Sequence, residues 1–150
     1  MEKAIYFDMD GTIANLYAVE GWLEMLREYD PTPYMQAKVM LNMAVFARLL
    51  NKLQKQGYHI GIVSWLSKQP TPFYNIAVTC TKMEWLQKHL PSVEFDEIKI
   101  IAYGTPKSQA VKYGGGILFD DERGNREQWK GQAYDEKNIL EILKNLVKNT

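Results

Sequence analysis

The sequence predicts an α/β fold in which a parallel, Rossmann-like sheet lies between layers of helices. Short apolar stretches that are typical of buried strands alternate along the chain with segments of helical periodicity. Three of these stretches end in the polar residues Asp8, Ser64 and Asp120. Because the carboxyl ends of parallel strands meet at one edge of a sheet, we expect these side chains to lie close together. The 150 residues suffice for a single domain with a substantial core.

The first strand is expected at Ala4–Phe7, where branched and aromatic side chains suit burial on both faces of a sheet. Asp8 and Asp10 follow it directly, and Gly11 gives the next turn freedom to bend. Clustered carboxylates repel and raise one another's pKa, and a divalent cation is the usual compensation. Since ligand sets made only of oxygen favour a hard ion, the expected cofactor is Mg²⁺.

Two helical segments are expected before the second strand. One covers 15–29 and ends at the turn 30–33, and the other covers about 34–56 and ends at Gly57. A crossover between parallel strands needs only one helix, so the extra helix predicts a small helical cap inserted at about 15–56. Its large side chains are interpreted as helix-packing residues, namely Trp22, Met25, Tyr29, Met40 and Met43.

The rest of the chain alternates between strands and helices. A strand at 58–63 ends in Ser64-Trp65, and a loop at 66–75 with Pro70 and Pro72 leads to a helix at 77–90. Next come a strand at 97–103, a short helix with Thr105 as N-cap and Pro106 as its first residue, and a strand at 116–119. A short helix at 125–129, a strand at 132–134 and a helix at 136–147 capped by Asp135 complete the chain.

The residues at the strand ends suit phosphoryl transfer through a covalent aspartyl intermediate. Asp8 is the expected nucleophile, and Asp10 is the expected general acid and base. Mg²⁺ is expected between the Asp8 carboxylate, the backbone carbonyl of Asp10 and Asp120, with Asp121 beside them. The ion would neutralise the charge of the phosphate, which a weak carboxylate nucleophile requires.

A second set of residues is expected to bind the phosphate itself. Ser64 offers a hydroxyl and neighbouring amides to a phosphate oxygen, and Trp65 is expected to line the substrate pocket. Lys107 supplies a positive charge that holds Asp8 and the phosphoryl group together.

These four motifs, in this order, resemble the haloacid dehalogenase-like phosphatase superfamily: Asp8-Met-Asp-Gly-Thr12, Ser64, Lys107 and Asp120-Asp121. The resemblance covers nearly the whole chain outside the segment 15–56. It implies a three-layer Rossmann-like sheet, Mg²⁺ and Asp8 as nucleophile. The short insertion and the run 118–123 are similar to the small 5′(3′)-deoxyribonucleotidase-like branch, which implies a small phosphorylated substrate such as a (deoxy)nucleoside monophosphate.

Several alternatives stay open at this point. The substrate could instead be another small phosphorylated metabolite or a nucleic-acid end, or the fold could be a metal- or phosphate-binding module without turnover. Basic and acidic residues balance at 18 each, which gives no strong signal for nucleic acid. A P-loop kinase is disfavoured because the chain lacks the Gly-rich run with Lys-Ser/Thr. The oligomeric state is left open.

Other residues receive structural interpretations. A single cysteine, Cys80, is expected to be a small buried side chain, and His59 and His89 are interpreted as structural. Lys82, Lys88 and Lys99 are scattered and form no basic stripe. With one cysteine, no apolar run of about 18 residues and no signal segment, the default expectation is a cytoplasmic protein without a membrane span.

Overall fold

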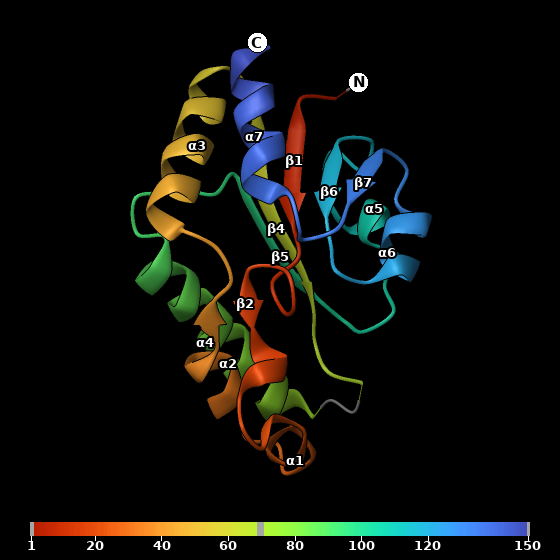
Figure 1. The fold of residues 1–150 in the computed structure, drawn as a ribbon. Coiled ribbons are helices and arrows are strands. Elements are labelled where there is room, and N and C mark those ends of the chain that lie inside the picture. The colour runs from red at the N-terminus through yellow and green to blue at the C-terminus, as the bar shows by residue number, and fades with distance from the viewer. Residues whose placement is uncertain (1, 69–70, 150) are drawn as a thin grey trace.

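The main sheet of the protein consists of five parallel strands in the order β5-β4-β1-β6-β7 (Figure 1). The computed structural model describes residues 2–68 and 71–149. The predicted Rossmann-like α/β fold is confirmed, with the first strand of the chain at the centre of the sheet. The strands are β1 (Ala4–Phe7), β4 (His59–Trp65), β5 (Glu97–Ile101), β6 (Ile117–Phe119) and β7 (Gln132–Tyr134).

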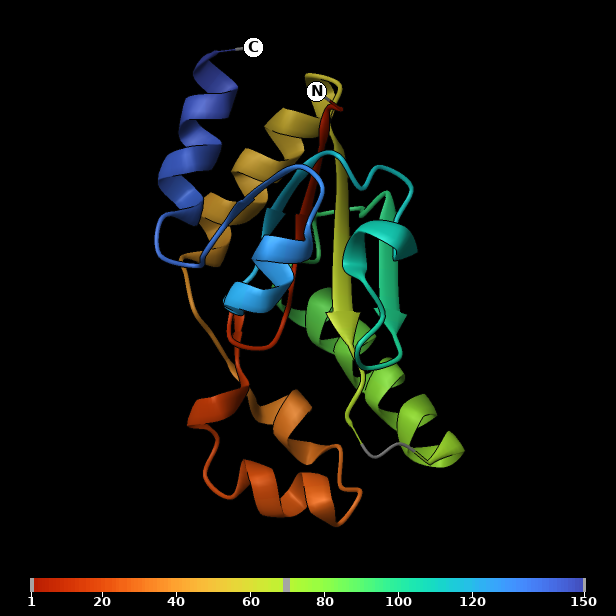
Figure 2. The same cartoon turned by 90° about the vertical axis from the view of Figure 1, so that its right-hand side faces the viewer.

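Helices cover both faces of this sheet and complete three layers. Ile5 and Phe7 of β1 point to one face, and Ala4 and Tyr6 point to the other, because side chains alternate along a strand. The first face packs against α3 (Met43–Lys55), α4 (Pro72–His89) and α7 (Ile139–Lys148). The short helices α5 (Lys107–Ala110) and α6 (Arg123–Gln128) lie on the other side (Figures 1 and 2).

The segment between β1 and α3 differs from the prediction. It contains a two-stranded antiparallel ribbon and three short helical turns instead of two long helices over 15–29 and 34–56. Gly21 and Tyr29 have φ angles of 75° and 58°, which an α-helix cannot accommodate. In order, the elements are β2 (Ala14–Asn15), the 3-10 helix η1 (Leu16–Ala18), α1 (Trp22–Arg27), α2 (Thr32–Gln36) and β3 (Lys38–Val39).

This inserted segment lies beyond the carboxyl ends of the strands of the main sheet (Figures 1 and 2). The helix α3, which the prediction joined to it, packs against α7 and β4 in the layers of the sheet instead. Trp85 of α4 ties the end of the insertion to the core, since its indole N–H donates to the carbonyl of Ala37 across 2.8 Å. A role of the segment as a cap over the site stays a prediction.

Two helix starts were predicted incorrectly. The helix α4 begins at Pro72 rather than at 77, because the Thr71 hydroxyl oxygen accepts from the N–H of Tyr74 and proline fits the first turn. The loop predicted at 66–75 is therefore shorter, and Pro70 lies outside the described residues. Pro106, not Thr105, occupies the N-cap position of α5, and the Thr105 hydroxyl donates to Ala102 instead.

The C-terminal helix and several side chains also depart from the prediction. The helix α7 begins at Ile139, and Asp135 accepts from the N–H of Lys137 in a turn that precedes the helix. Cys80 is exposed rather than buried. Tyr29 and Met40, interpreted as packing residues, are exposed as well. Within residues 2–68 and 71–149, no helix is long and apolar enough to cross a membrane.

Candidate active site

Three strands of the main sheet bring polar side chains together at their carboxyl ends. Asp8 follows β1, Ser64 lies near the end of β4, and Asp120 follows β6. Because β1 lies between β4 and β6, Asp8 lies between the other two. The backbone N–H of Asp8 donates to the carbonyl of Phe119 across 2.9 Å, which extends the β1–β6 ladder to the edge. All three side chains are buried, as the sheet topology leads one to expect.

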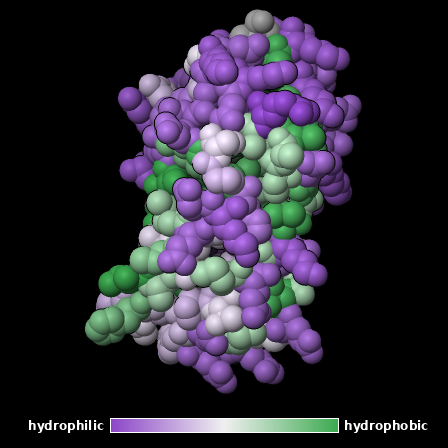
Figure 3. Space-filling view, turned by 90° about the vertical axis from the view of Figure 1, so that its left-hand side faces the viewer, coloured by the Kyte–Doolittle hydropathy of each residue, from purple (hydrophilic) through white to green (hydrophobic). Residues whose placement is uncertain are grey.

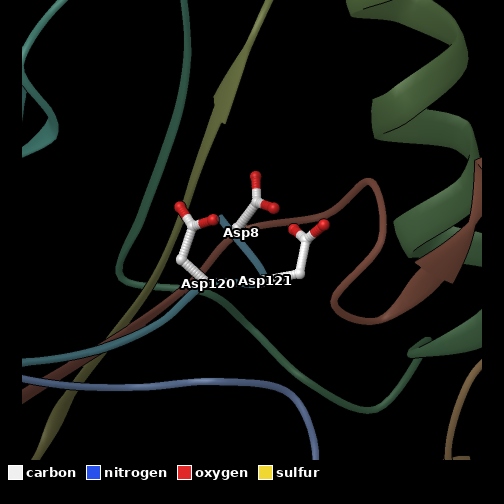
Figure 4. A group of neighbouring side chains, drawn as sticks. All are labelled: Asp8, Asp120 and Asp121. Carbon is white, nitrogen blue, oxygen red and sulfur yellow. The ribbon is translucent and has the colours of Figure 1, made fainter. Parts of the chain in front are cut away.

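Asp8, Asp120 and Asp121 form a group of carboxylates whose facing oxygens all lie within 4.8 Å of one another (Figure 4). Thr12 links two of them: its hydroxyl lies 3.0 Å from Asp8 Oδ2 and 3.1 Å from Asp121 Oδ1. The same oxygen accepts from the backbone N–H of Asp121. The loop that follows β1 thus fixes carboxylates from both strand ends in one position.

Asp120 is held from the opposite side of the group. The backbone N–H of Glu122 donates to its Oδ1 across 2.9 Å, and the side-chain amide of Asn125 donates to its Oδ2 across 3.2 Å. Asn125 is itself buried at the start of α6. Such fixed carboxylate oxygens are the ligands that Mg²⁺ prefers, so the donor set fits the expected ion.

The electrostatics of the carboxylate group favour a bound cation. Burial raises the pKa of Asp120 to about 6, and the nearby charge of Asp8 adds to this increase. Burial also raises the pKa of Asp121 to about 8, with further contributions from its contact with Asp8 and the charge of Asp120. Without a cation, the site therefore tends to bind protons near neutral pH, and a divalent ion would remove that tendency.

Lys107 supplies a fixed positive charge to the group from the first residue of α5. Its Nζ lies 2.9 Å from Asp8 Oδ1 and 2.7 Å from Asp120 Oδ2, and the side chain is buried. Burial alone would lower the pKa of Lys107, but the charges of Asp8 and Asp120 outweigh burial and raise it. The ammonium group therefore stays protonated and touches the side chain predicted as nucleophile.

Lys82 is a second buried lysine in the site, and the sequence analysis assigned it no role. Its Nζ, on α4, lies 2.9 Å from Asp10 Oδ2 and 2.7 Å from Ser64 Oγ, and it donates to the carbonyl of Trp65 across 2.9 Å. One signal pointed to it. In a helix, Lys82 shares a face with the apolar Val78 and Trp85, and a lysine there must find a partner.

The carboxylate of Asp10 lies apart from the three-carboxylate group because it pairs with Lys82. Burial raises the pKa of Asp10, and the charge of Lys82 opposes that increase. The predicted metal ligand of this residue is its backbone carbonyl, and this stays a prediction. An acid with a raised pKa beside a nucleophile is suited to proton transfer.

A pocket of about 510 Å³ opens above these residues toward the inserted segment. Asp8, Asp10 and Lys107 lie in its wall, which places the polar cluster inside the pocket. The rest of its lining is rich in aromatic side chains. The sequence predicted only Trp65 as a pocket residue and interpreted the others as packing residues or gave them no role. These aromatic residues are Tyr17, Trp22, Tyr34, Trp65 and Tyr103.

Four of these five aromatic residues form two pairs. The rings of Tyr17 and Trp22 lie edge to face with centroids 5.1 Å apart, and those of Trp65 and Tyr103 lie 4.8 Å apart. Trp65 is further fixed because its indole N–H donates to the carbonyl of Thr105 across 2.8 Å. Trp65 lines this pocket, and its contact with the substrate stays a prediction. Trp22, interpreted as a packing residue, also lines the pocket.

Comparisons with known proteins identify the fold. No family model matches the chain, and no curated protein matches it. The solved structure of D,D-heptose 1,7-bisphosphate phosphatase from Burkholderia thailandensis resembles it with a TM-score of 0.59. The likeness covers 97% of this chain and 99% of that chain at 11% sequence identity. The two proteins therefore share a fold over almost their whole lengths.

Proposed function

We propose that the protein is a Mg²⁺-dependent phosphomonoester hydrolase of the haloacid dehalogenase-like superfamily. The observation that carries this proposal is the buried cluster of Asp8, Asp120 and Asp121 with Lys107 at the strand ends. The order of the four motifs along the chain and a fold shared with a phosphatase support it. The cluster combines a candidate nucleophile, candidate metal ligands and a fixed cation in one place.

In the proposed reaction, a carboxylate oxygen of Asp8 attacks the phosphorus atom of the substrate. The bond between phosphorus and the ester oxygen breaks, and Asp10 donates its proton to the departing oxygen. Asp10 then removes a proton from water, whose oxygen attacks the phosphorus of the aspartyl phosphate. The bond between phosphorus and the Asp8 oxygen breaks, which releases phosphate and restores the Asp8 carboxylate. The raised pKa of Asp10 supports its role as the acid of the first step.

Mg²⁺, when bound, would neutralise negative charge on the phosphoryl oxygens and bring them beside Asp8. Its proposed ligands are the carboxylates of Asp8 and Asp120 and the backbone carbonyl of Asp10, with Asp121 alongside. Lys107 adds a positive charge in contact with Asp8 Oδ1. The hydroxyl of Ser64 is proposed to donate to a remaining phosphoryl oxygen, and Lys82, whose ammonium group donates to the Ser64 oxygen, is proposed to orient it.

The proposed substrate is a (deoxy)nucleoside monophosphate. The pocket of about 510 Å³ is within the size range of small-molecule sites, and its aromatic lining suits a planar base. A sugar phosphate is the second candidate, because the similar solved structure is that of a heptose bisphosphate phosphatase. Because every nucleobase has a flat π face that stacks on aromatic rings, the lining favours the nucleotide.

Phosphate release from a panel of deoxynucleotides, ribonucleotides and sugar phosphates, with and without Mg²⁺, tests the proposal. The expected result is metal-dependent turnover of nucleoside monophosphates that Asp8→Asn abolishes. Asp10→Asn is the matched second variant, and it should retain Mg²⁺ binding while turnover falls. If no phosphate is released from any substrate, or if Asp8→Asn is as active as the wild type, the proposal is wrong.

A further inference from the structure

The outer face of α4 carries a row of exposed apolar side chains. Phe73 is 86% exposed, Ile76 is 62% exposed and Met83 is 43% exposed, and Cys80 between them is exposed as well. Figure 3 shows hydrophobic side chains that protrude at the lower left of that view, where α4 begins. We refer to Phe73, Ile76, Cys80 and Met83 as the α4 stripe.

The opposite face of α4 already has its partners. Tyr74 and Val78 are buried in a cluster that they share with residues of the inserted segment, and Trp85 is buried in the main core. Lys82, on the same inner face, reaches the candidate active site. The α4 stripe is therefore not required for packing within the chain, and its exposure leaves apolar surface in contact with water.

The spacing of the α4 stripe is that of a helix-pairing seam. Its members are three, four and three residues apart, which is the alternation at the a and d positions of a coiled coil. Such a row stays on one side of a helix for its whole length. A second helix that presents the same spacing is the partner that fits it.

We propose that the α4 stripe is a dimer interface, in which α4 packs antiparallel against α4 of a second copy of this chain. In an antiparallel seam, a positions of one helix face d positions of the other. With the two-fold axis at the level of residue 78 along the helix, Phe73 faces the partner's Met83 and Ile76 faces the partner's Cys80. The symmetry repeats both contacts, as an isologous interface requires.

Size complementarity supports this register. The large Phe73 meets a flexible methionine, and the branched Ile76 meets a small cysteine, so each layer combines side chains that can interdigitate. All four members of the stripe then have an apolar partner in a second copy. A foreign helix would need to supply the same complement, whereas this chain supplies it to itself.

Charge complementarity supports the antiparallel direction. Glu84, exposed next to Met83, would face the first turn of the partner's α4, where the helix dipole is positive. The two-fold axis provides this contact twice. In a parallel pair, each Glu84 would instead lie near the carboxyl-terminal end of the partner's α4, where the helix dipole is negative.

The inserted segment also carries an exposed apolar side chain close to α4 in the fold. A single helix pair buries less than the roughly 1,200 Å² of a stable interface, so further contacts are needed. The helix α2 packs against α4, and its Met35 is also exposed. The proposed interface lies on the outer face of α4, whereas Lys82 lies on its inner face. The proposal does not depend on the function of the active site.

Sedimentation equilibrium over a hundredfold range of protein concentration tests the proposal first. The wild type is expected to be a dimer at the upper end, and the double variant Phe73→Glu/Ile76→Glu is expected to be a monomer throughout. Both residues are exposed, so the far-ultraviolet circular dichroism of the variant should equal that of the wild type. A wild type that is monomeric at every concentration, or a double variant that still dimerises, would overturn the proposal.

Disulfide formation tests the register. Ile76→Cys in the presence of the native Cys80 should give a covalent dimer with a mild oxidant such as diamide, because these positions share a layer. The two native Cys80 residues lie about 6 Å apart along the axes, in addition to the separation of the helices, and should not be joined. Gln87→Cys, exposed on the same helix, is the matched control and should remain monomeric on denaturing gels.

Two further results would contradict the dimer. If Ile76→Cys and Gln87→Cys are cross-linked equally, the contact is collisional and the proposal is wrong. If a monomeric wild type instead binds vesicles of neutral phospholipid, and Phe73→Glu/Ile76→Glu abolishes that binding, the α4 stripe is a membrane contact and the dimer is excluded.

Discussion

Lys82 on α4 donates to Asp10 on the loop after β1, across 2.9 Å and 72 positions of the chain. The same ammonium group touches Ser64 at the end of β4. A single buried cation therefore joins a helix, a loop and a strand at the candidate active site. Because its charge opposes the effect of burial on Asp10, the contact concerns both the stability of the fold and the protonation of the proposed acid.

Replacement of Lys82 by methionine should destabilise the protein by about 3 kcal/mol near neutral pH, because it leaves the mostly buried Asp10 carboxylate without its cation. Protonation of Asp10 relieves that cost. Its folded-state pKa, already raised, rises further in the variant, so the lost stability is recovered as the pH falls. Urea unfolding of the wild type and Lys82→Met at about pH 8 and pH 5 should show a larger difference at the higher pH.

Lys82→Arg is the matched variant for this experiment. It retains the charge and should recover more of the stability than Lys82→Met, with a fall in phosphate release because the guanidinium geometry differs. Equal destabilisation by Lys82→Met at both pH values would contradict the assignment of the effect to the Asp10 carboxylate.

The metal-free protein should lose stability as the pH rises through neutrality. Asp120 and Asp121 have pKa values raised to about 6 and about 8, so the folded state binds more protons than the unfolded state above the ordinary carboxyl range. The stability linked to these protons is complete below about pH 4 and is lost as the pH passes those values. Thermal unfolding in EDTA should therefore show a Tm that falls between about pH 5 and pH 8.

Addition of Mg²⁺ should raise the Tm most at the upper end of that pH range, because the ion replaces the protons. Asp121→Asn cannot ionise at this position, and its metal-free Tm should depend less on pH than that of the wild type. A Tm that is independent of pH in EDTA, or that Mg²⁺ leaves unchanged, would argue against a metal site at these three carboxylates.

The parts of the site that could be predicted from the sequence are those encoded locally. Asp8, Ser64 and Asp120 each follow or end an apolar strand, and parallel strands bring such ends to one edge whatever the details of packing. Lys107 could be found because a proline directly precedes it at a helix start. For these residues, the place next to a strand end or at a helix start, which the sequence shows, also determines the place in the fold.

The parts that could not be predicted depend on contacts between distant segments. A lone lysine in a helix is usually solvated, so Lys82 gave no sign of its partners apart from the apolar residues on its face. The inserted segment has helical periodicity, yet the pairing of Ala14 with Val39 and the left-handed Gly21 and Tyr29 divide it into short pieces. Local propensity there yields to long-range pairing.

Gly11→Ala should destabilise the protein and weaken Mg²⁺ binding. Gly11 has a φ of 82°, and a Cβ there would overlap the carboxylate of Asp121 and lie 2.8 Å from the Tyr17 ring. The backbone strain alone should cost about 1 kcal/mol, and the displaced carboxylate should lower metal affinity in addition. Urea unfolding and titration calorimetry with Mg²⁺ measure the two effects separately.

Gly104→Ala separates strain from overlap. Gly104 has a similar φ of 86°, but apart from Gly104 itself and its chain neighbours no atom of the described residues lies within 4 Å of the position that its Cβ would occupy. This variant should therefore lose stability and keep its Mg²⁺ affinity. If Gly104→Ala lowers the Mg²⁺ affinity as much as Gly11→Ala does, close contact with Asp121 is not the reason that position 11 requires glycine.

Removal of one aromatic side chain from the pocket lining should weaken the binding of a nucleotide more than it slows the chemical step. Trp22 lines the pocket and packs edge to face against Tyr17, and the proposed chemistry uses none of its atoms. Stacking of a base on an aromatic ring contributes about 1–3 kcal/mol, which corresponds to a roughly 5- to 150-fold change in affinity. Trp22→Ala should therefore raise KM for a nucleoside monophosphate within that range and leave kcat nearly unchanged.

Tyr29→Ala is the control for this prediction. Tyr29 is exposed in the same segment but lies outside the lining, so the variant should leave KM unaltered. An equal rise in KM for sugar phosphates and nucleotides would mean that Trp22 shapes the pocket without stacking on a base.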